Sequence, residues 1–478
     1  MSISPRACSA LFAIAVLVLS SGGCGTHGIL KPMTANLRAM ANPYRPNANA
    51  RIVWETVIGD STKSSSISAI DAASSGPYSF RGSMNGQTGV GVLGSSGSLV
   101  CFEPTLFWST GVCALSLASP APGCFVVAGA HDASGDGLTD RGDFALFTNS
   151  GELLDQLQVV SDSSRVWLSG LAPLTDSTFI AVGQEVRGTL RFPYIALLAV
   201  TSDRHVALRA RTVLESQPGR YLDEAAAFPP APGDDGLFLC ALSRSATEPV
   251  EVAGIRATLP DLSDASVEWH RQVVSGTGPE NDLSAITRIG DNVFVVGHTD
   301  DTRKQPVPNN GGYWPSGLAA SYTRGGELRW LTVVNLSPYS ESFYGVTATP
   351  TAVCVLGRGG GVMGLANARD DEVFGYGLIS RLDPNSGQVI QNLTLGQDTY
   401  ESGFNSATYA DGALTCAGWT ACELSPGPCR AWMCRVDVTT PAALAASSVP
   451  AQAEVRAPAR ARAPRTLDGP LESLGRSR

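Results

Sequence analysis

The most regular feature of the chain is a short apolar run that recurs along most of its length. The run occupies 78–84, 124–131, 178–185, 236–243, 292–299, 352–359 and 413–420. In six copies the run ends at a glycine, and in the fourth copy Ala241 takes that place. Consecutive copies are 47 to 61 residues apart. A period of this length corresponds to a structural unit of several strands rather than to a single hairpin.

Each apolar run lies within a unit of four segments that have the pattern of short β-strands. The segment before the run carries a small residue, such as Ala69 or Gly345, and the segment after it ends in a hairpin sequence such as 149-NSG-151. A fourth strand completes the unit, as in 327–334. Four antiparallel strands in each of seven units predict an all-β fold, the seven-bladed β-propeller. A ring of six or eight blades is the alternative.

The two ends of the repeat region complement each other. The segment 51–59 has the pattern of a fourth strand and resembles 327–334, whereas the last unit ends at 438 after three strands. We therefore expect the N-terminal strand to complete the last blade, which removes the free edge of an open ring. The first blade is the weakest copy, because its segment 86–102 is rich in glycine.

The N-terminal residues have the pattern of an export signal. Arg6 precedes the apolar stretch 11–19, which is too short to span a bilayer. The following 19-LSSGGCG-25 resembles the lipobox of bacterial lipoproteins. This resemblance implies a signal peptide over 1–23, lipidation of Cys24 and, because glycine rather than aspartate follows the cysteine, an outer-membrane location. Ordinary signal cleavage that leaves Cys24 unmodified is the alternative.

Two segments flank the predicted β-propeller, which spans 51–438. Residues 24–50 show no periodicity, and we expect a flexible tether between the lipid and the ring. Residues 439–478 are rich in Ala, Pro and Arg and poor in apolar bulk, so their composition predicts a disordered tail. This tail is basic, whereas the whole chain has a net charge of −9, which argues against nucleic acid as a partner.

The sequence pattern of the repeat resembles that of a family of bacterial secreted propeller proteins. The shared pattern is a glycine-ended apolar strand, a polar loop, a Gly-Asp-Phe sequence such as 142–144 that opens the third strand, and a Ser-Gly hairpin. The resemblance covers about 51–438 and implies the fold and an exported location. It implies no particular activity, because one fold carries many functions.

The cysteines are expected to be in an oxidising compartment. Eleven are present, and nine remain once Cys8 is removed with the signal and Cys24 carries lipid, so at least one stays a free thiol. Cys422 and Cys429 flank a tight loop and form the best disulfide pair, and Cys101 with Cys113 is a second candidate. The others lie in apolar strand patterns and are expected to be buried thiols: Cys124, Cys240, Cys354, Cys416 and Cys434.

Ligand binding is expected on the face where the second and third strands of each blade are connected. Three long insertions emerge there, at 298–317, 358–377 and 419–430. They carry aromatic, charged and imidazole side chains that suit a carbohydrate or peptide ligand. These candidate contacts are His298, Asp300, Tyr313, Trp314, Arg358 and Trp419. The alternative is that the aromatic side chains only hold the long loops on the ring.

A catalytic set is not evident in the sequence. The histidines of the repeats fall in different units, and no nucleophile elbow, metalloprotease pair or phosphate loop occurs in a fitting context. Asp223 and Glu224 could face the central channel as paired carboxylates. Because adjacent residues of a strand point to opposite faces, we expect them not to converge on one proton.

One loop has the spacing of a calcium site. Within 131-HDASGDGLTDRGDF-144, oxygen-bearing residues recur in the register of an EF-hand loop, with Gly137 at the turn. The candidate Ca²⁺ ligands are Asp132, Ser134, Asp136, the carbonyl of Leu138, Asp140 and Asp143. Asp143 replaces the usual bidentate glutamate and no helices flank the loop, so a polar turn is an equal alternative.

Three functions follow from these features. The first is a lipid-anchored propeller of the cell envelope that acts as a non-catalytic scaffold for a protein or glycan ligand. The second is a surface hydrolase or lyase that acts on polysaccharide or peptide. The third is a purely structural envelope component. The sequence favours the first, because it combines a lipobox with the absence of a catalytic constellation.

Overall fold

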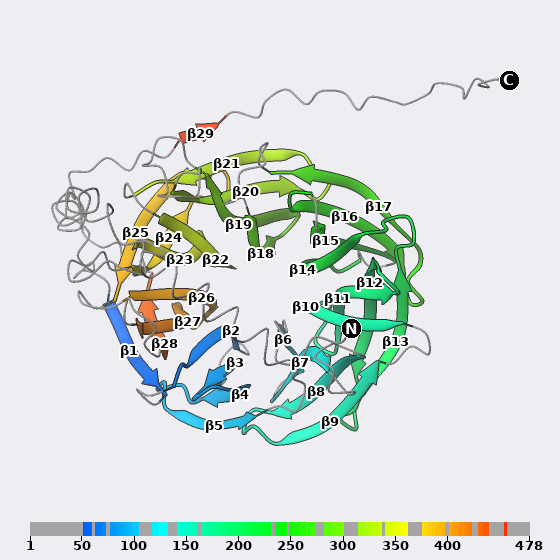
Figure 1. The fold of residues 1–478 in the computed structure, drawn as a ribbon, viewed down its shortest axis with the longest axis horizontal. Helices are drawn as coiled ribbons and strands as arrows, with labels where there is room; N and C mark the ends of the chain where they lie inside the picture. Colours follow the sequence, from blue (N-terminus) through cyan, green and yellow to red (C-terminus); the bar gives the residue numbers. More distant parts are fainter. Residues whose placement is uncertain are drawn as a thin grey trace, which may run out of the picture.

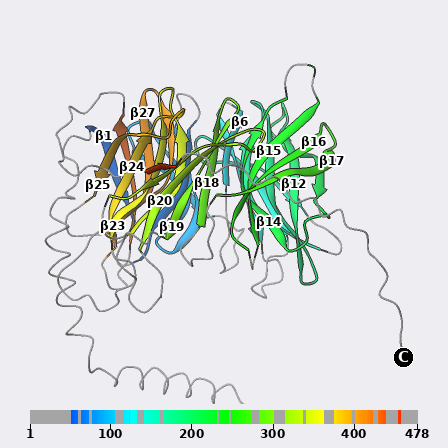
Figure 2. The same ribbon diagram turned by 90° about the horizontal axis from the view of Figure 1, so that it is seen from above.

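The computed structural model describes 51–59, 63–72, 77–104, 116–121, 123–131, 141–159, 164–230, 233, 235–245, 248–273, 282–300, 314–336, 340–361, 375–396, 401–422, 429–438 and 454–456. These residues form seven antiparallel sheets arranged as blades around a central axis (Figure 1). Seen edge-on, the ring is a disc (Figure 2). The predicted all-β, seven-bladed propeller of four-stranded blades is confirmed.

Blades 1 to 3 follow one another along the chain. Their strands are β2 (Ser66–Ala72), β3 (Tyr78–Met84), β4 (Gln87–Leu93) and β5 (Leu99–Pro104); β6 (Ser116–Ala121), β7 (Cys124–His131), β8 (Arg141–Thr148) and β9 (Leu153–Val159); and β10 (Arg165–Pro173), β11 (Thr178–Arg187), β12 (Leu190–Val200) and β13 (Val206–Val213). The first strand of each blade lies nearest the axis and the fourth lies on the rim (Figure 1).

Blades 4 to 6 repeat this order. Their strands are β14 (Arg220–Phe228), β15 (Gly236–Ser245), β16 (Glu251–Thr258) and β17 (Ser263–Gln272); β18 (Asp282–Ile289), β19 (Asn292–Asp300), β20 (Pro315–Thr323) and β21 (Leu328–Val334); and β22 (Ser340–Ala348), β23 (Val353–Gly361), β24 (Tyr376–Leu382) and β25 (Val389–Leu395). Every recurring apolar run is the second strand of its blade and is buried between neighbouring strands, and apolar clusters join each blade to the next.

Blade 7 is built from both ends of the repeat region. It contains β26 (Glu401–Ala410), β27 (Ala413–Cys422), β28 (Arg430–Asp437) and, on its rim, β1 (Arg51–Ile58). β1 pairs antiparallel with β28 from Arg51 opposite Asp437 to Ile58 opposite Ala431. The predicted closure of the ring by the N-terminal strand is therefore confirmed.

Side chains of the rim strands explain why β1 fits there. A Cβ added to Gly97, in the last hairpin of blade 1, would lie 2.4 Å from Cε3 of Trp54 on β1. Trp330 packs in the same way on Gly387 of the following blade, 2.6 Å from such an added atom. In blade 7, the indole Nε1 of Trp432 also donates to Glu55 Oε1 of β1 at 2.7 Å. Trp54 thus has the role of a fourth-strand tryptophan.

In five blades, the glycine that ends the apolar run is required by a close approach to the innermost strand. In blades 1, 3, 5, 6 and 7, an added Cβ would lie 1.8 to 2.2 Å from a backbone carbonyl oxygen of that strand. In the same blades the innermost strand contains a β-bulge beside the glycine. In blade 4 the bulge is displaced along the strand, to between Leu222 and Ala225, and Ala241 pairs with Ala225. The sequence exception and the displaced bulge therefore occur together.

This relation predicts that two exchanges of glycine and alanine in opposite directions both destabilise the fold. Gly183→Ala should lower the free energy of unfolding by about 3 kcal/mol, because its Cβ would lie 1.9 Å from the carbonyl oxygen of Trp167. Ala241→Gly restores the repeat residue but removes a fully buried methyl group, so it should also destabilise, by about 1 kcal/mol. Denaturant unfolding measures both. A stabilising Ala241→Gly would mean that blade 4 is only a defective copy of the repeat.

Blade 1 keeps its strands despite the glycine-rich third segment. Gly91 of β4 lies in register between Phe80 of β3 and Phe102 of β5. The two rings stack across it with centroids 6.3 Å apart. The aromatic side chains thus cover the space that the glycine leaves, and the segment that looked weakest in the sequence still forms a regular sheet.

A short strand lies outside the predicted propeller boundaries. β29 (Glu454–Arg456) pairs antiparallel with the rim strand β21 of blade 5, with Val455 opposite Thr332. These three residues belong to the segment predicted to be a disordered tail. The remainder of 439–478, like the predicted signal peptide and tether over 1–50, lies outside the described residues.

Candidate functional site

Polar residues occupy the bulges of the innermost strands. In five blades one extra residue separates a buried apolar residue from a small one, and these extra residues are Ser68, Ser169, Ser284, Tyr344 and Asn405. All except Ser169 are accessible to solvent. Because the innermost strands border the axis, the bulges line the centre of the ring with polar groups.

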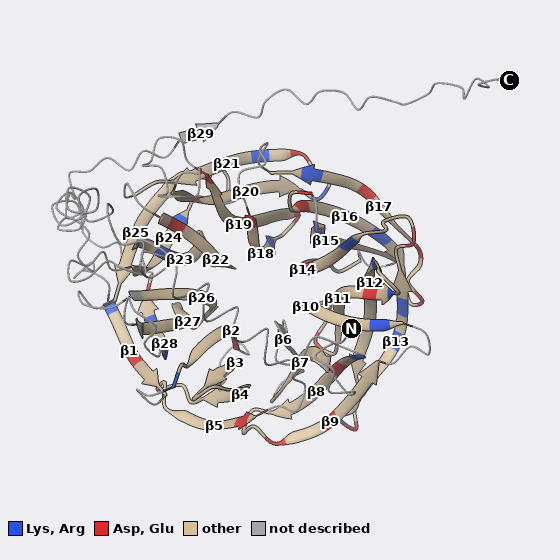
Figure 3. Ribbon diagram, in the orientation of Figure 1, with Lys and Arg blue, Asp and Glu red and all other residues tan. Residues whose placement is uncertain are grey.

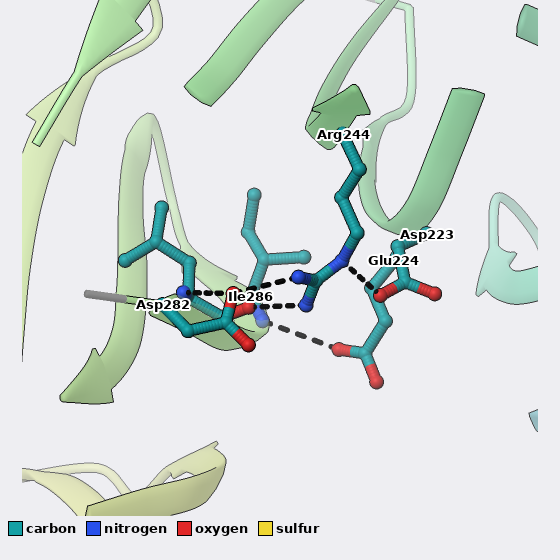
Figure 4. Close-up of polar contacts among 6 residues, drawn as sticks. Asp223, Glu224, Arg244, Asp282 and Ile286 are labelled. Atoms are coloured by element: carbon teal, nitrogen blue, oxygen red, sulfur yellow. Dashed lines mark hydrogen bonds and ion pairs between the residues drawn. The ribbon is translucent and has the colours of Figure 1, made fainter. Parts of the chain in front are cut away.

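Blade 4 places two carboxylates at its bulge. Asp223 and Glu224 together lie opposite Leu242, since the register shifts between Leu222 and Ala225. A bulge breaks the alternation of side chains along a strand. Figure 4 shows the Asp223 carboxyl group facing Arg244 and the Glu224 carboxyl group facing Ile286 of β18. The assumption of a regular strand is therefore wrong here, whereas the expectation that the two carboxyl groups do not converge on one proton stays a prediction.

An arginine from the second strand binds Asp223, one member of this pair. The Arg244 guanidinium donates from Nε to Asp223 Oδ2 at 2.5 Å and from Nη1 to Asp282 Oδ1 at 2.6 Å (Figure 4). Its Nη2 also donates to the carbonyl oxygen of Leu283 at 2.5 Å. The side chain of Arg244 is 17% exposed. Arg244 thus joins blade 4 to blade 5 through two hydrogen bonds, to Asp282 and Leu283, and binds Asp223 within its own blade.

Glu224 has a different environment from Asp223. Its Oε2 accepts a hydrogen bond from the backbone N–H of Ile286 at 3.3 Å, and no other hydrogen bond to it is found among the described residues. Burial, followed by the charge of Asp223, raises the pKa of Glu224 to about 7. The Arg81 guanidinium acts in the opposite direction. Glu224 is therefore a carboxyl group that changes its protonation near neutral pH.

Arg81 reaches this cluster electrostatically from blade 1. Burial lowers its pKa to about 10, while Glu224 and Asp223 oppose that shift. Within the described part of the chain, the buried Nε of Arg81 has no hydrogen-bond partner and the side chain makes no ion pair. Arg81 and Glu224 thus interact through space without touching. Figure 3 shows both signs of charge where β14, β15 and β18 come together.

Part of this cluster has a structural role that blade 7 performs with neutral groups. There Ser406 Oγ accepts from the N–H of Ile70 at 3.4 Å, and Asn405 Nδ2 donates to the carbonyl oxygen of Ile67 at 2.7 Å. Glu224 and Arg244 make the equivalent contacts with Ile286 and Leu283 of the next blade. Neutral side chains can therefore link two blades, and the charges of Asp223, Glu224 and Arg244 are not required for that link.

The six residues that were predicted to contact a ligand differ in how far the structure exposes them. His298 lies directly opposite Asp282 in the β18–β19 register, and Asp300 ends β19; both are half-buried. Trp314 and Arg358 are only 2% and 3% exposed. Trp419 is half-buried, with its ring centroid 6.0 Å from that of Tyr344. Tyr313 and the interiors of the long loops lie outside the described residues. Ligand contact by these six residues stays a prediction.

We call Arg81, Asp223, Glu224, Arg244 and Asp282 the axis cluster, and it lies on the face that was predicted to bind ligand. Asp223 and Glu224 are near the start of β14, and Arg220 at that start pairs with Ser245, beside the loop that connects the second and third strands. In blades 5 to 7, the loops that connect the second and third strands are the long insertions. The register places His298 directly opposite Asp282, which belongs to this cluster.

The predicted calcium loop is almost entirely outside the described residues. Asp143, its last member, is fully buried in β8, with Oδ2 3.7 Å from Nε of Arg141. Among the described residues, no group of three or more His, Cys, Asp or Glu could hold a metal ion. Calcium binding by the loop stays a prediction.

The cysteines of the strands are free thiols where they are described. Cys124, Cys240, Cys354, Cys416 and Cys434 are buried, as predicted. Cys101 is also free, so the candidate pair with Cys113 does not form. The pairing of Cys422 with Cys429 stays a prediction, because nothing is described of the Cys422 side chain. No helix of the described residues is long and apolar enough to cross a membrane.

Comparisons with known proteins show similarity at the level of the fold. No family model matches the chain, and no curated protein matches its sequence. Among solved structures, it is similar to the polysaccharide lyase Uly1, at 10% identity over 78% of this chain and 90% of that chain, with a TM-score of 0.45. A quinohemoprotein alcohol dehydrogenase from Comamonas testosteroni gives 10% identity over 84% of this chain and 78% of that chain, with a TM-score of 0.45. Virginiamycin B lyase from Staphylococcus aureus gives 10% identity over 80% of this chain and 99% of that chain, with a TM-score of 0.43.

These similarities carry no information on activity. Identities of this size are compatible with unrelated functions on one architecture. The seven-bladed assignment rests on the strand pairing of this chain. The chain is therefore a seven-bladed β-propeller whose function must be argued from its own residues.

Proposed function

We propose that the chain is a lipid-anchored propeller of the cell envelope that binds a ligand without catalysis, at the axis on the long-loop face. The observation that supports this most is the unmatched pair formed by Arg81 and Glu224. One is an arginine whose buried Nε lacks a hydrogen-bond partner among the described residues, and the other is a half-buried carboxyl group with a single hydrogen bond. Unsatisfied polar groups held in a rigid ring suit a bound polar molecule.

The chemistry of the pair favours a neutral ligand rich in hydroxyl groups. The cluster holds two arginines, Arg81 and Arg244, and three carboxyl groups, so it is neutral when Glu224 is protonated and carries one negative charge when Glu224 is ionised. An anion would be repelled in the ionised state, and a cation would compete with Arg81. A hydroxyl group both accepts from a guanidinium and donates to a carboxylate. We therefore propose a carbohydrate as the ligand.

A binding screen tests this proposal. The full chain with Cys24→Ser, which removes the lipid attachment, is applied to arrays of glycans and of peptides. We expect the protein to be retained on glycans and not on peptides. Retention on peptides alone would transfer the proposal to a peptide ligand, and the absence of binding to either array would favour a purely structural component.

A second candidate function has one observation in its favour. A carboxyl group that titrates near pH 7, as Glu224 does, is suited to general acid or base catalysis. The surface hydrolase or lyase therefore stays a candidate. Incubation of each bound glycan with the protein, followed by chromatography of the products, separates the two. New reducing ends or unsaturated products that disappear in Glu224→Gln would replace binding by catalysis.

The protonation of Glu224 predicts a pH dependence of stability. The folded chain keeps a proton between pH 4.5 and about 7 that the unfolded chain releases, so the wild-type free energy of unfolding should fall across this range, by at most about 3 kcal/mol, and level off above it. Glu224→Gln should be equally stable near pH 4 and more stable at pH 8. Denaturant unfolding at several pH values measures the difference. Parallel profiles for the two proteins would show that Glu224 titrates normally.

The anchor is tested separately from the ligand. Lipidation at Cys24 should place the wild-type protein in the membrane fraction and label it with a radioactive fatty acid. Cys24→Ser should lose the label and leave the membranes. A Cys24→Ser protein that stays membrane-bound would refute the lipid anchor without affecting the proposed binding site.

A further inference from the structure

Two buried cysteines lie directly opposite each other in blade 7. Cys416 on β27 and Cys434 on β28 are partners in an antiparallel register that runs without a bulge from Ala413 to Thr420. Opposite residues of such a pair have Cα atoms about 4.5–5.5 Å apart and side chains on the same face. This separation is within the range of about 4.4–6.8 Å that a disulfide spans.

The thiol groups are already in contact in the folded protein. Both side chains are fully buried in the apolar cluster between blades 6 and 7. Burial raises the pKa of the Cys416 thiol, and its hydrogen bond with the Cys434 thiol raises the pKa further. Both are free thiols in this structure. A third buried thiol, that of Cys354 in blade 6, belongs to the same cluster.

From this geometry we propose that Cys416 and Cys434 form a cross-strand disulfide when the chain folds in the presence of a disulfide oxidant. A low-molecular-weight disulfide takes up two electrons and the two thiol protons and becomes two thiols, while a bond forms between the two Sγ atoms. The inference goes beyond the proposed function and does not depend on it. Cys354 is not the partner, because it lies on another blade rather than opposite either residue.

The crosslink would lie in the blade that closes the ring. β28 pairs with β27 on one side and with the N-terminal strand β1 on the other. A bond between β27 and β28 therefore secures the strand to which β1 must attach at the end of folding. Because the pair is inaccessible in the finished ring, exchange has to occur before blades 6 and 7 pack together.

Refolding and peptide mapping test the proposal. The full chain is unfolded with a reductant, refolded with oxidised and reduced glutathione, treated with N-ethylmaleimide and digested without reduction. Trypsin places Cys434 in the peptide 431–435 and Cys416 in the peptide 382–430, and chymotrypsin then cleaves after Trp419 to separate Cys416 from Cys422. A chain that does not refold is replaced by protein exported to an oxidising compartment and mapped in the same way.

We expect a linked peptide that contains only Cys416 and Cys434, and a melting temperature roughly 3–6 °C above that of protein refolded with a reductant. Cys434→Ala should lose the linked peptide and this difference. Cys240→Ala, which removes a fully buried cysteine of blade 4, should keep both. Recovery of both residues as maleimide adducts, or a link from either one to Cys354 or Cys422, would overturn the proposal.

Discussion

Replacing Arg244 with alanine is expected to lower the free energy of unfolding by about 3 kcal/mol, because it leaves two carboxylates beside the axis without their shared partner. Arg244 is the only described group that holds both Asp223 and Asp282, at 2.5 and 2.6 Å. The loss should also disturb the packing of blade 4 on blade 5, since the contact with the carbonyl oxygen of Leu283 disappears. Denaturant unfolding at pH 7 measures the change.

A matched arginine in the two outer strands of the same blade is the control. Arg256 forms one ion pair with Glu268 at 3.6 Å, and their side chains are 63% and 40% exposed. Arg256→Ala should change the free energy of unfolding by less than about 1 kcal/mol. Equal effects of the two substitutions would show that the axis cluster has no special role in joining the blades.

Deleting the N-terminal strand is expected to have the largest effect of any change considered. Removal of 51–58 eliminates β1, its pairing with β28 and the burial of Trp54, Val57 and Ile58 in the apolar clusters. Burial of apolar side chains of this kind stabilises by about 1.5–3 kcal/mol each when complete, so the loss should be of the order of 5 kcal/mol. Blade 7 would then present an open edge and promote association.

Deletion of 439–478 is the comparison. It removes β29, which has only three residues paired with the rim of blade 5, and it leaves the ring closed. Its effect on the melting temperature should be small, and the protein should stay monodisperse in light scattering. If loss of the tail destabilised the chain as much as loss of β1, the closure of blade 7 would not be the main determinant of stability.

The fold was predictable because its signal is repeated. Seven apolar runs with hairpin residues at similar offsets gave the blade count, and the similarity of 51–59 to 327–334 gave the closure. Trp54 and Trp330 show the physical reason, since both pack on a glycine of the next blade. The function of each repeat glycine was not predictable, because it depends on a bulge in a different strand.

The axis cluster was not predictable for the same reason. A regular strand would send the side chains of Asp223 and Glu224 to opposite faces. The displaced bulge changes this, and the sequence did carry a trace of it: blade 4 is the one unit in which alanine, Ala241, replaces the repeat glycine. Arg81 of blade 1 lies 143 positions before Glu224 in the sequence. Only the closed ring places the two residues within electrostatic reach of each other.

The most direct test of the account is the affinity of a glycan identified by the array, measured by calorimetry against single variants of the non-lipidated chain. If Arg81 and Glu224 hold the ligand, Arg81→Gln and Glu224→Gln should each weaken binding at least about tenfold, by about 1.4 kcal/mol. Arg256→Gln and Glu268→Gln, in the two outer strands of blade 4, should leave the affinity unchanged. Unchanged affinity in both axis variants would contradict the binding site proposed at the centre of the ring.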